Sequence, residues 1–131
     1  MQKKTMMCSP LITLALVAML GLAACGGSSS VSSNVLTLGS ANFVGPTNLT
    51  VKPGISVQII DPTTTGSKHN LVTGTNGMFT AMDGAPPALS SSQGLSLNAG
   101  DTRTVTFAKP GTYQITCTIH PTMQATITVK L

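Results

Sequence analysis

The stretch from Cys117 to Met123 brings together three side chains that bind soft metal ions. Its sequence is Cys-Thr-Ile-His-Pro-Thr-Met, so a thiol, an imidazole and a thioether follow one another at intervals of three residues. Thiolate, imidazole and a weak thioether favour copper over magnesium, calcium or manganese. The spacing therefore predicts that Cys117, His120 and Met123 lie on one tight metal-binding loop.

A second imidazole is needed to complete a trigonal site of two histidines and one cysteine with a long axial methionine. The only histidine besides His120 is His69, which lies far before Cys117 in the sequence. It must therefore reach the loop from a different strand. Such a site would connect two parts of the fold that are distant in the chain.

The remainder of the chain has the pattern of short strands. After Asn34 no helical period is present, and apolar residues alternate with polar ones between clusters of Gly, Pro, Asn and Asp. This pattern is typical of an all-β sandwich or barrel. Between residues 74 and 92 the pattern is irregular and predicts a long loop, with room for a short helix. The alternating runs are 49–51, 55–59, 95–97, 105–107, 112–117 and 125–131.

The alternation also predicts where the cysteine points. Successive strand residues face opposite sides of a sheet, so Cys117 shares a face with Tyr113 and Ile115. We therefore expect its sulfur to face the apolar interior, and the strands on either side to hold the loop as a hairpin does. Tyr113 is expected to brace a turn, as the tyrosine corner of sandwich folds does.

With this ordered set of motifs the chain resembles the cupredoxins, the small blue copper proteins. The resemblance rests on His69 followed by Asn70, on Pro-Gly-Thr-Tyr at 110–113, and on the Cys-x₂-His-x₂-Met loop, whose short spacing is similar to that of amicyanin-like members. It covers residues 35–131 and implies a Greek-key β-sandwich or barrel that binds one type 1 copper ion. The implied ligands are His69, Cys117, His120 and Met123, the last as the weak axial ligand.

The resemblance extends to groups around the ligands. Asn70 resembles the family's asparagine that bonds across to the residue after the cysteine, here Thr118; the alternative is a simple turn residue. Two positions depart from the family pattern, because Lys68 and Ile119 replace prolines that are common before the first and second histidine. Neither change removes a ligand.

The first 24 residues resemble a bacterial lipoprotein signal. Two lysines precede an apolar run at 11–22, and Leu-Ala-Ala-Cys ends at Cys25, as in a secretory signal followed by a lipidation motif. We expect residues 1–24 to be removed and Cys25 to carry lipid. Residues 25–34 would form a flexible Gly/Ser linker to the domain at 35–131. An ordinary export signal without a lipid is the alternative.

The composition narrows the classes of function. Removal of the two lysines of the signal from seven basic residues leaves five against three Asp, which is too weak a charge to favour nucleic acid. Four protein ligands leave no open position for a substrate, and three Asp with no Glu offer little acid–base chemistry. We therefore expect that this protein is not an enzyme.

What the resemblance implies is a monomeric carrier of single electrons. It would be lipid-anchored on the periplasmic or extracytoplasmic face of a membrane. Its partners would be redox proteins of a respiratory or photosynthetic chain, such as a cytochrome or a membrane oxidoreductase. Two alternatives remain. One is a copper carrier that delivers metal to a membrane oxidase or pump. The other is a binding or structural lipoprotein that uses copper little or not at all.

Overall fold

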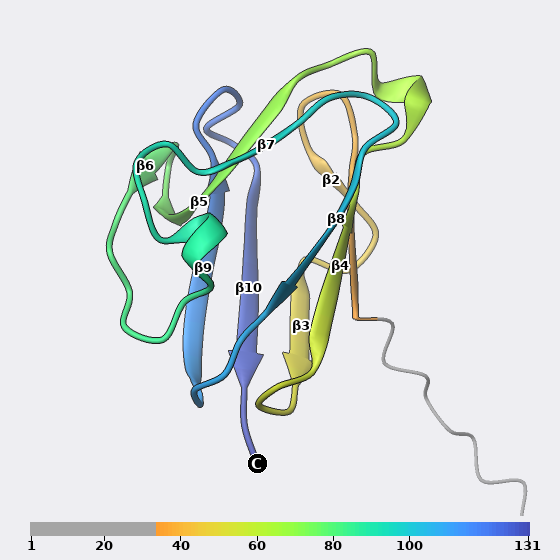
Figure 1. Cartoon of the computed structure of the whole chain (residues 1–131). Coiled ribbons are helices and arrows are strands. Elements are labelled where there is room, and N and C mark those ends of the chain that lie inside the picture. Colours follow the sequence, from red (N-terminus) through yellow and green to blue (C-terminus); the bar gives the residue numbers. More distant parts are fainter. Residues whose placement is uncertain (1–33) are drawn as a thin grey trace, which may run out of the picture.

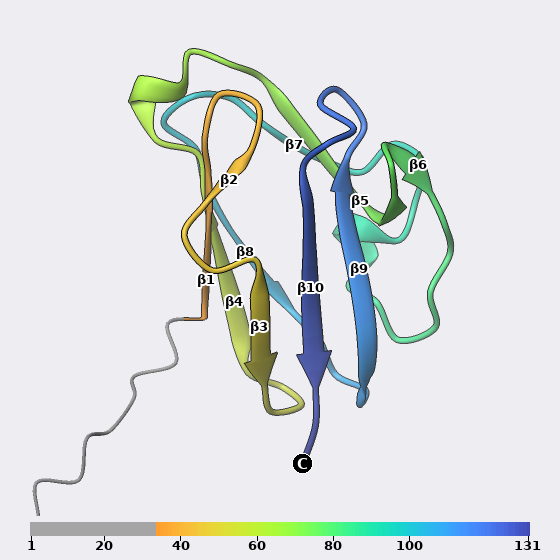
Figure 2. The same cartoon turned by 180° about the vertical axis from the view of Figure 1, so that it is seen from behind.

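The computed structural model describes residues 34–131, so the predicted signal, the lipidated cysteine and nearly all of the linker lie outside the described residues. Two β-sheets face one another as a sandwich (Figures 1 and 2). This confirms the all-β fold expected from the alternation.

Along the chain the elements are β1 (Val35–Leu38), β2 (Phe43–Val44), β3 (Asn48–Val51), β4 (Ser56–Ile60), the 3₁₀-helix η1 (Thr63–Thr65), β5 (His69–Thr75), β6 (Met78–Phe79), the 3₁₀-helix η2 (Pro87–Leu89), β7 (Leu95–Leu97), β8 (Thr102–Thr106), β9 (Gly111–Cys117) and β10 (Gln124–Val129).

The two sheets differ in their strand order. The smaller sheet has the order β2-β1-β4-β8, and the larger has the order β3-β10-β9-β5-β6, with β7 also paired to β5. Within the larger sheet β10 is antiparallel to β9 and parallel to β3. Parallel neighbours cannot be joined by a tight hairpin, so the chain passes between sheets, and residues distant in sequence become neighbours. The strands β9, β10 and β5 of this sheet position the predicted ligands.

The core lies between the sheets and consists of the inward residues of the alternating strands. Val57 and Ile59 of β4 belong to one core cluster with Ile115 of β9 and Ile127 of β10, and all four are at most 1% exposed. Burial of each such side chain stabilises the fold by about 1.5–3 kcal/mol. Ile55, expected to share their face, precedes β4 and is 43% exposed. Its backbone N–H closes a turn onto the carbonyl of Lys52, so the strand begins one residue later than the pattern suggested.

The irregular stretch at 74–92 is attached to the larger sheet. It contains β6 and η2, so the expected loop includes the short helix for which the sequence left room. The buried Thr73 hydroxyl lies 2.8 Å from the carbonyl oxygen of Thr80 and 3.2 Å from that of Leu89, and Leu89 is fully buried. Among the described residues, neither helix is long and apolar enough to cross a membrane.

Candidate metal centre

The ligand loop connects two neighbouring antiparallel strands at one end of the sandwich (Figure 1). β9 ends at Cys117 and β10 begins at Gln124. Backbone hydrogen bonds close the loop, because Met123 donates to the carbonyl of His120 at 2.9 Å and Cys117 donates to the carbonyl of Met123 at 3.3 Å. The expected hairpin is confirmed, and it fixes the backbone on both sides of the predicted ligands.

His69 is the first residue of β5, the strand beside β9. The register pairs Leu71 with Cys117, so His69 extends just beyond this pair toward the loop. Two hydrogen bonds fasten the neighbouring residues: the Thr118 backbone N–H donates to the Asn70 carbonyl at 2.9 Å, and the Asn70 side-chain amide donates to the Thr118 hydroxyl at 3.1 Å. The side-chain bond expected between Asn70 and Thr118 is therefore present.

Three of the predicted donor atoms converge. The Cys117 sulfur lies 3.9 Å from Nδ1 of His69 and 3.9 Å from Nδ1 of His120, and the three donor atoms all lie within 4.8 Å of one another. A metal with bonds of about 2.0–2.3 Å to three surrounding donors requires those donors to be about 3.5–4 Å apart. The two distances from the Cys117 sulfur to the histidine nitrogens therefore match those of a trigonally bound metal.

Met123 ends the loop and is 1% exposed. Its carbonyl accepts hydrogen bonds from the Thr116 hydroxyl at 3.1 Å and from the Cys117 backbone, which anchors it to the last residues of β9. Met123 adds a buried thioether to the loop that carries the thiol and one imidazole, and this is a soft set of donors. The cluster of His69, Cys117 and His120, together with Met123, fits one type 1 copper ion.

Burial separates the two histidines. His69 and Cys117 are fully buried, whereas His120 is partly exposed. Without metal, burial lowers the pKa of His69 below its ordinary value of 6.5; the Asp61 carboxylate opposes this shift, and the His120 ring adds to it. A neutral imidazole is the form that binds a metal. The buried histidine is thus kept ready for an ion at neutral pH.

One group beside the cluster, Asp61, is not among the site residues predicted from the sequence. Asp61 is fully buried, and its Oδ2 lies 3.9 Å from Nε2 of His69. The residue follows β4, in the smaller sheet, and no metal-ligand motif includes it. Because Asp-Pro is also an ordinary turn dipeptide, nothing in the local sequence of Asp61 and Pro62 marks this contact.

The turn between β5 and β6 lies against the ligand loop. The backbone N–H of Gly77 donates to the Thr116 hydroxyl at 2.9 Å, and the Gln124 amide donates to the Asn76 side chain at 2.8 Å. A Cβ at Gly77 would come within 2.9 Å of Pro121. At the other end of β9, the Tyr113 hydroxyl donates to the carbonyl of Lys109 at 2.9 Å, as the expected turn brace requires.

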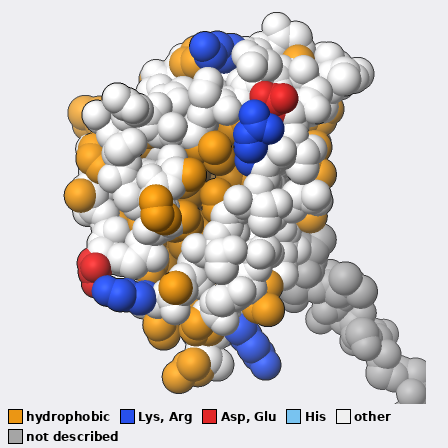
Figure 3. All heavy atoms as spheres, viewed as in Figure 1, with side chains coloured by type: hydrophobic (Ala, Val, Ile, Leu, Met, Phe, Trp, Pro, Cys, Tyr) orange, Lys and Arg blue, Asp and Glu red, His pale blue; other side chains and the backbone are white. Residues whose placement is uncertain are grey.

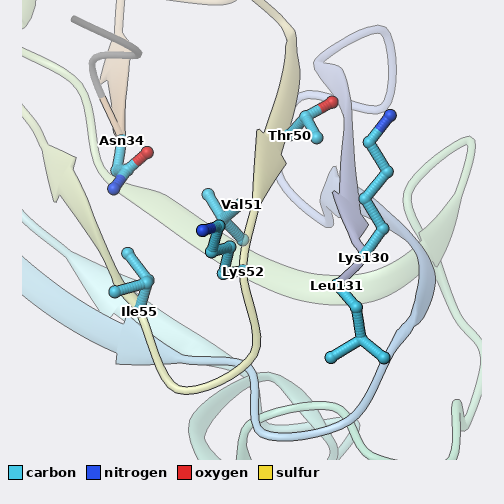
Figure 4. Close-up of a pocket in the computed structure, with 7 residues that line it drawn as sticks. All are labelled: Asn34, Thr50, Val51, Lys52, Ile55, Lys130 and Leu131. Atoms are coloured by element: carbon cyan, nitrogen blue, oxygen red, sulfur yellow. The ribbon is translucent and has the colours of Figure 1, made fainter.

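A pocket lies at the other end of the sandwich from the ligand loop, close to the C-terminal residue (Figures 1 and 4). It contains none of the copper-cluster residues, so it is separate from the metal chemistry. Its lining residues are Asn34, Thr50, Val51, Lys52, Ile55, Lys130 and Leu131.

Solved structures with this fold include several amicyanins. The amicyanin of Paracoccus versutus (Thiobacillus versutus) is 17% identical, with 79% of this chain and 86% of that chain covered and a TM-score of 0.56. An amicyanin variant in its reduced state is 23% identical over 73% and 80% of the two chains, with a TM-score of 0.54. A second variant, with Cu(I), is 21% identical over the same shares, with a TM-score of 0.55. These likenesses establish the sandwich fold.

No curated protein sequence matches the chain. A family model does match: that of the copper-binding proteins of the plastocyanin/azurin family, over residues 33–130. Members of this family are typically electron carriers rather than enzymes. Because the match includes both strands of the ligand hairpin and the distant histidine, the chain belongs to the plastocyanin/azurin family of copper-binding proteins.

Proposed function

We propose that this protein carries single electrons by cycling one copper ion between Cu(II) and Cu(I). His69, Cys117 and His120 would hold the ion, and Met123 would be its weak axial ligand. The observation that carries the proposal is the convergence of three donor atoms within 4.8 Å, held by strand pairing and by a hydrogen-bonded loop. Ligands that are already in place need to move little when the charge of the ion changes. An electron carrier benefits directly from this property.

The partly exposed His120 is the proposed route for electrons. Beside it Ile119 is 47% exposed. Met78, which is 66% exposed, follows Gly77, the residue that lies against Pro121 of the ligand loop. An apolar, weakly charged surface around this ring suits a brief contact with a redox protein such as a cytochrome or a membrane oxidoreductase. We propose that partners approach this end of the molecule.

Surface charge would contribute little to such a contact. On the face of the molecule shown in Figure 3, charged side chains are few and scattered, and hydrophobic side chains are exposed between them. Two of the three Asp residues pair with neighbouring basic side chains, Asp83 with Lys109 at 3.0 Å and Asp101 with Arg103 at 3.4 Å. Exposed charges are also screened by salt beyond about 10 Å at 0.1 M ionic strength. We therefore expect partner association to depend only mildly on salt.

A copper carrier is the second candidate. The same exposure of His120 that lets electrons pass would also let a competing ligand approach the ion from outside. The two functions separate when the copper-loaded protein is mixed with a redox partner and, independently, with a copper chelator. Rapid electron exchange with slow loss of copper is the expected result. Fast metal loss together with sluggish electron exchange would reject the shuttle in favour of the carrier.

We propose further that Cys25 anchors the protein to the extracytoplasmic face of a membrane, and that it works as a monomer. Asn34, the first described residue, lines the same pocket as Leu131, at the end away from the ligand loop (Figures 1 and 4). An anchor attached there would leave His120 directed away from the lipid, toward partners. Replacement Cys25→Ala should release the protein into the soluble fraction. Continued membrane binding would contradict a lipid on this residue.

A further inference from the structure

Two buried side-chain polar atoms of the described residues lack a hydrogen-bond partner, and they lie near each other. They are Oδ2 of Asp61 and Nε2 of His69. Both side chains are fully buried, and the two atoms are 3.9 Å apart. An unsatisfied buried polar group costs about 1–3 kcal/mol, more when it is charged. The fold therefore tolerates an unfavourable arrangement directly behind a predicted ligand.

Asp61 is firmly fixed from the side of the smaller sheet. Its Oδ1 accepts a hydrogen bond of 2.6 Å from the hydroxyl of Thr65 in η1. Its backbone N–H donates to the carbonyl of Asp101 at 2.8 Å, and its carbonyl accepts from Gly100 at 2.7 Å. With one oxygen and the backbone occupied, Oδ2 is left directed at the histidine.

His69 presents its two nitrogens to different neighbours. Nδ1 lies 3.9 Å from the Cys117 sulfur, whereas Nε2 faces Asp61. A neutral imidazole carries one proton, so a histidine that binds metal through Nδ1 has its proton on Nε2. Histidines that bind metals commonly donate this outer N–H to a carboxylate, which fixes the ring and makes the inner nitrogen a better donor.

We propose that Asp61 is a positioning residue for the copper centre, accepting the Nε2 proton of His69 and placing a buried negative charge behind the ion. This inference rests on the proposed function. A fixed negative charge in a dry interior stabilises Cu(II) more than Cu(I), because the oxidised ion carries one more positive charge. Asp61 therefore lowers the reduction potential of this protein.

The test compares Asp61→Asn with Asp83→Asn in the copper-loaded, full-length protein. Each change removes one negative charge and keeps the shape of the side chain, but Asp83 is 89% exposed and pairs with Lys109. We expect Asp61→Asn to stay blue and to favour Cu(I) about three- to tenfold, a rise in potential of up to about 59 mV for one electron. Asp83→Asn should give a much smaller shift. Equal shifts in the two blue variants would overturn the role of Asp61.

A second test of the role of Asp61 uses the unmodified protein, so it does not depend on whether a variant folds. In the diamagnetic Cu(I) form of the unmodified protein, NMR should show a His69 Nε2–H that is shifted downfield and exchanges slowly with water. Rapid exchange of this proton would overturn the inference. A wild-type protein that binds copper without a blue band contradicts the proposed function itself. A blue wild type with a freely exchanging Nε2–H contradicts only the role of Asp61.

Discussion

The two sides of the copper centre are built in different ways. On one side, His69 is a fully buried strand residue, and the carboxylate behind it belongs to Asp61, which directly follows β4 of the opposite sheet. On the other side, His120 is a partly exposed residue of a short loop, next to the exposed Ile119. Both rings reach the same sulfur at 3.9 Å. The two histidine rings therefore lie at the same distance from the Cys117 sulfur, but only His120 is open to solvent.

This difference indicates a division of work between the two histidines. The buried side is surrounded by packed, low-dielectric protein, where charges act strongly on the ion. On the loop side, the proposed function would let an electron enter or leave through the partly exposed ring of His120. If the division is correct, changes on the buried side should alter affinity and potential, and changes on the loop side should alter access.

The largest expected effect comes from the ligand shared by both sides. Replacement Cys117→Ser removes the thiolate, so the intense charge-transfer band should disappear and copper affinity should fall. Absorption spectroscopy of the copper-loaded protein measures both. The control is Cys25→Ser, which changes a cysteine outside the domain and should leave the band unaltered. A band that survives in Cys117→Ser would show that another group supplies the chromophore.

The next effect tests the two histidines against each other. Replacement His120→Gly opens a gap at the surface, so imidazole added to the solution should restore the blue band. Replacement His69→Gly leaves a gap in the packed interior, where added imidazole has no access, and also leaves Asp61 without its partner. We expect rescue of the first variant and not of the second. Rescue of both to the same extent would refute the contrast in access.

A smaller effect is expected at the axial position. Replacement Met123→Leu conserves volume, and such swaps in a core usually cost less than about 1.5 kcal/mol. Copper should stay bound through the other three ligands, while the reduction potential shifts because the axial ligand tunes it. Voltammetry and copper analysis of the same sample test this. Loss of copper would mean that Met123 holds the ion rather than tunes it.

The hydrogen bond that joins the strand of His69 to the ligand loop can also be removed. Replacement Asn70→Ala removes the 3.1 Å bond to the Thr118 hydroxyl, which joins the start of β5 to the ligand loop. A bond of this kind contributes about 0.5–1.5 kcal/mol, so the free energy of unfolding should fall by that amount in a denaturant titration. The control Gln58→Ala changes an exposed residue of the smaller sheet. An equal fall in the free energy of unfolding in Asn70→Ala and Gln58→Ala would show that this hydrogen bond has no specific role.

The smallest effect is the pH dependence of the metal-free protein. Because the pKa of His69 is lowered by burial in the folded state, the unfolded chain takes up this proton first as the pH falls. The contribution of His69 to stability is therefore complete above about pH 6.5, declines as the pH falls below it, and levels off below the folded pKa. Thermal unfolding from pH 8 to pH 5 measures this. In His69→Gln the fall in thermal stability with decreasing pH should be smaller. An unchanged pH dependence would mean that other groups cause the fall.

The loop side of the centre was readable from the sequence, and the buried side only in part. The positions of Cys117, His120 and Met123 depend on local spacing, and the alternation of β9 correctly placed the sulfur inward. His69 was identified because it is the only other histidine, without any local signal for its strand partner. Asp61 was missed because its contact arises from packing of one sheet on the other. Such a contact depends on tertiary structure, and no characteristic spacing of residues in the sequence marks it.

Titration of Cu(II) into the soluble protein from Ser28 onward, with absorption and voltammetry recorded together, tests whether this domain is a blue copper electron carrier. We expect an intense blue band that saturates at one copper per chain, disappears on one-electron reduction and returns on reoxidation. A protein that stays colourless at saturation, or whose copper cannot be reduced and reoxidised without being lost, would contradict this function.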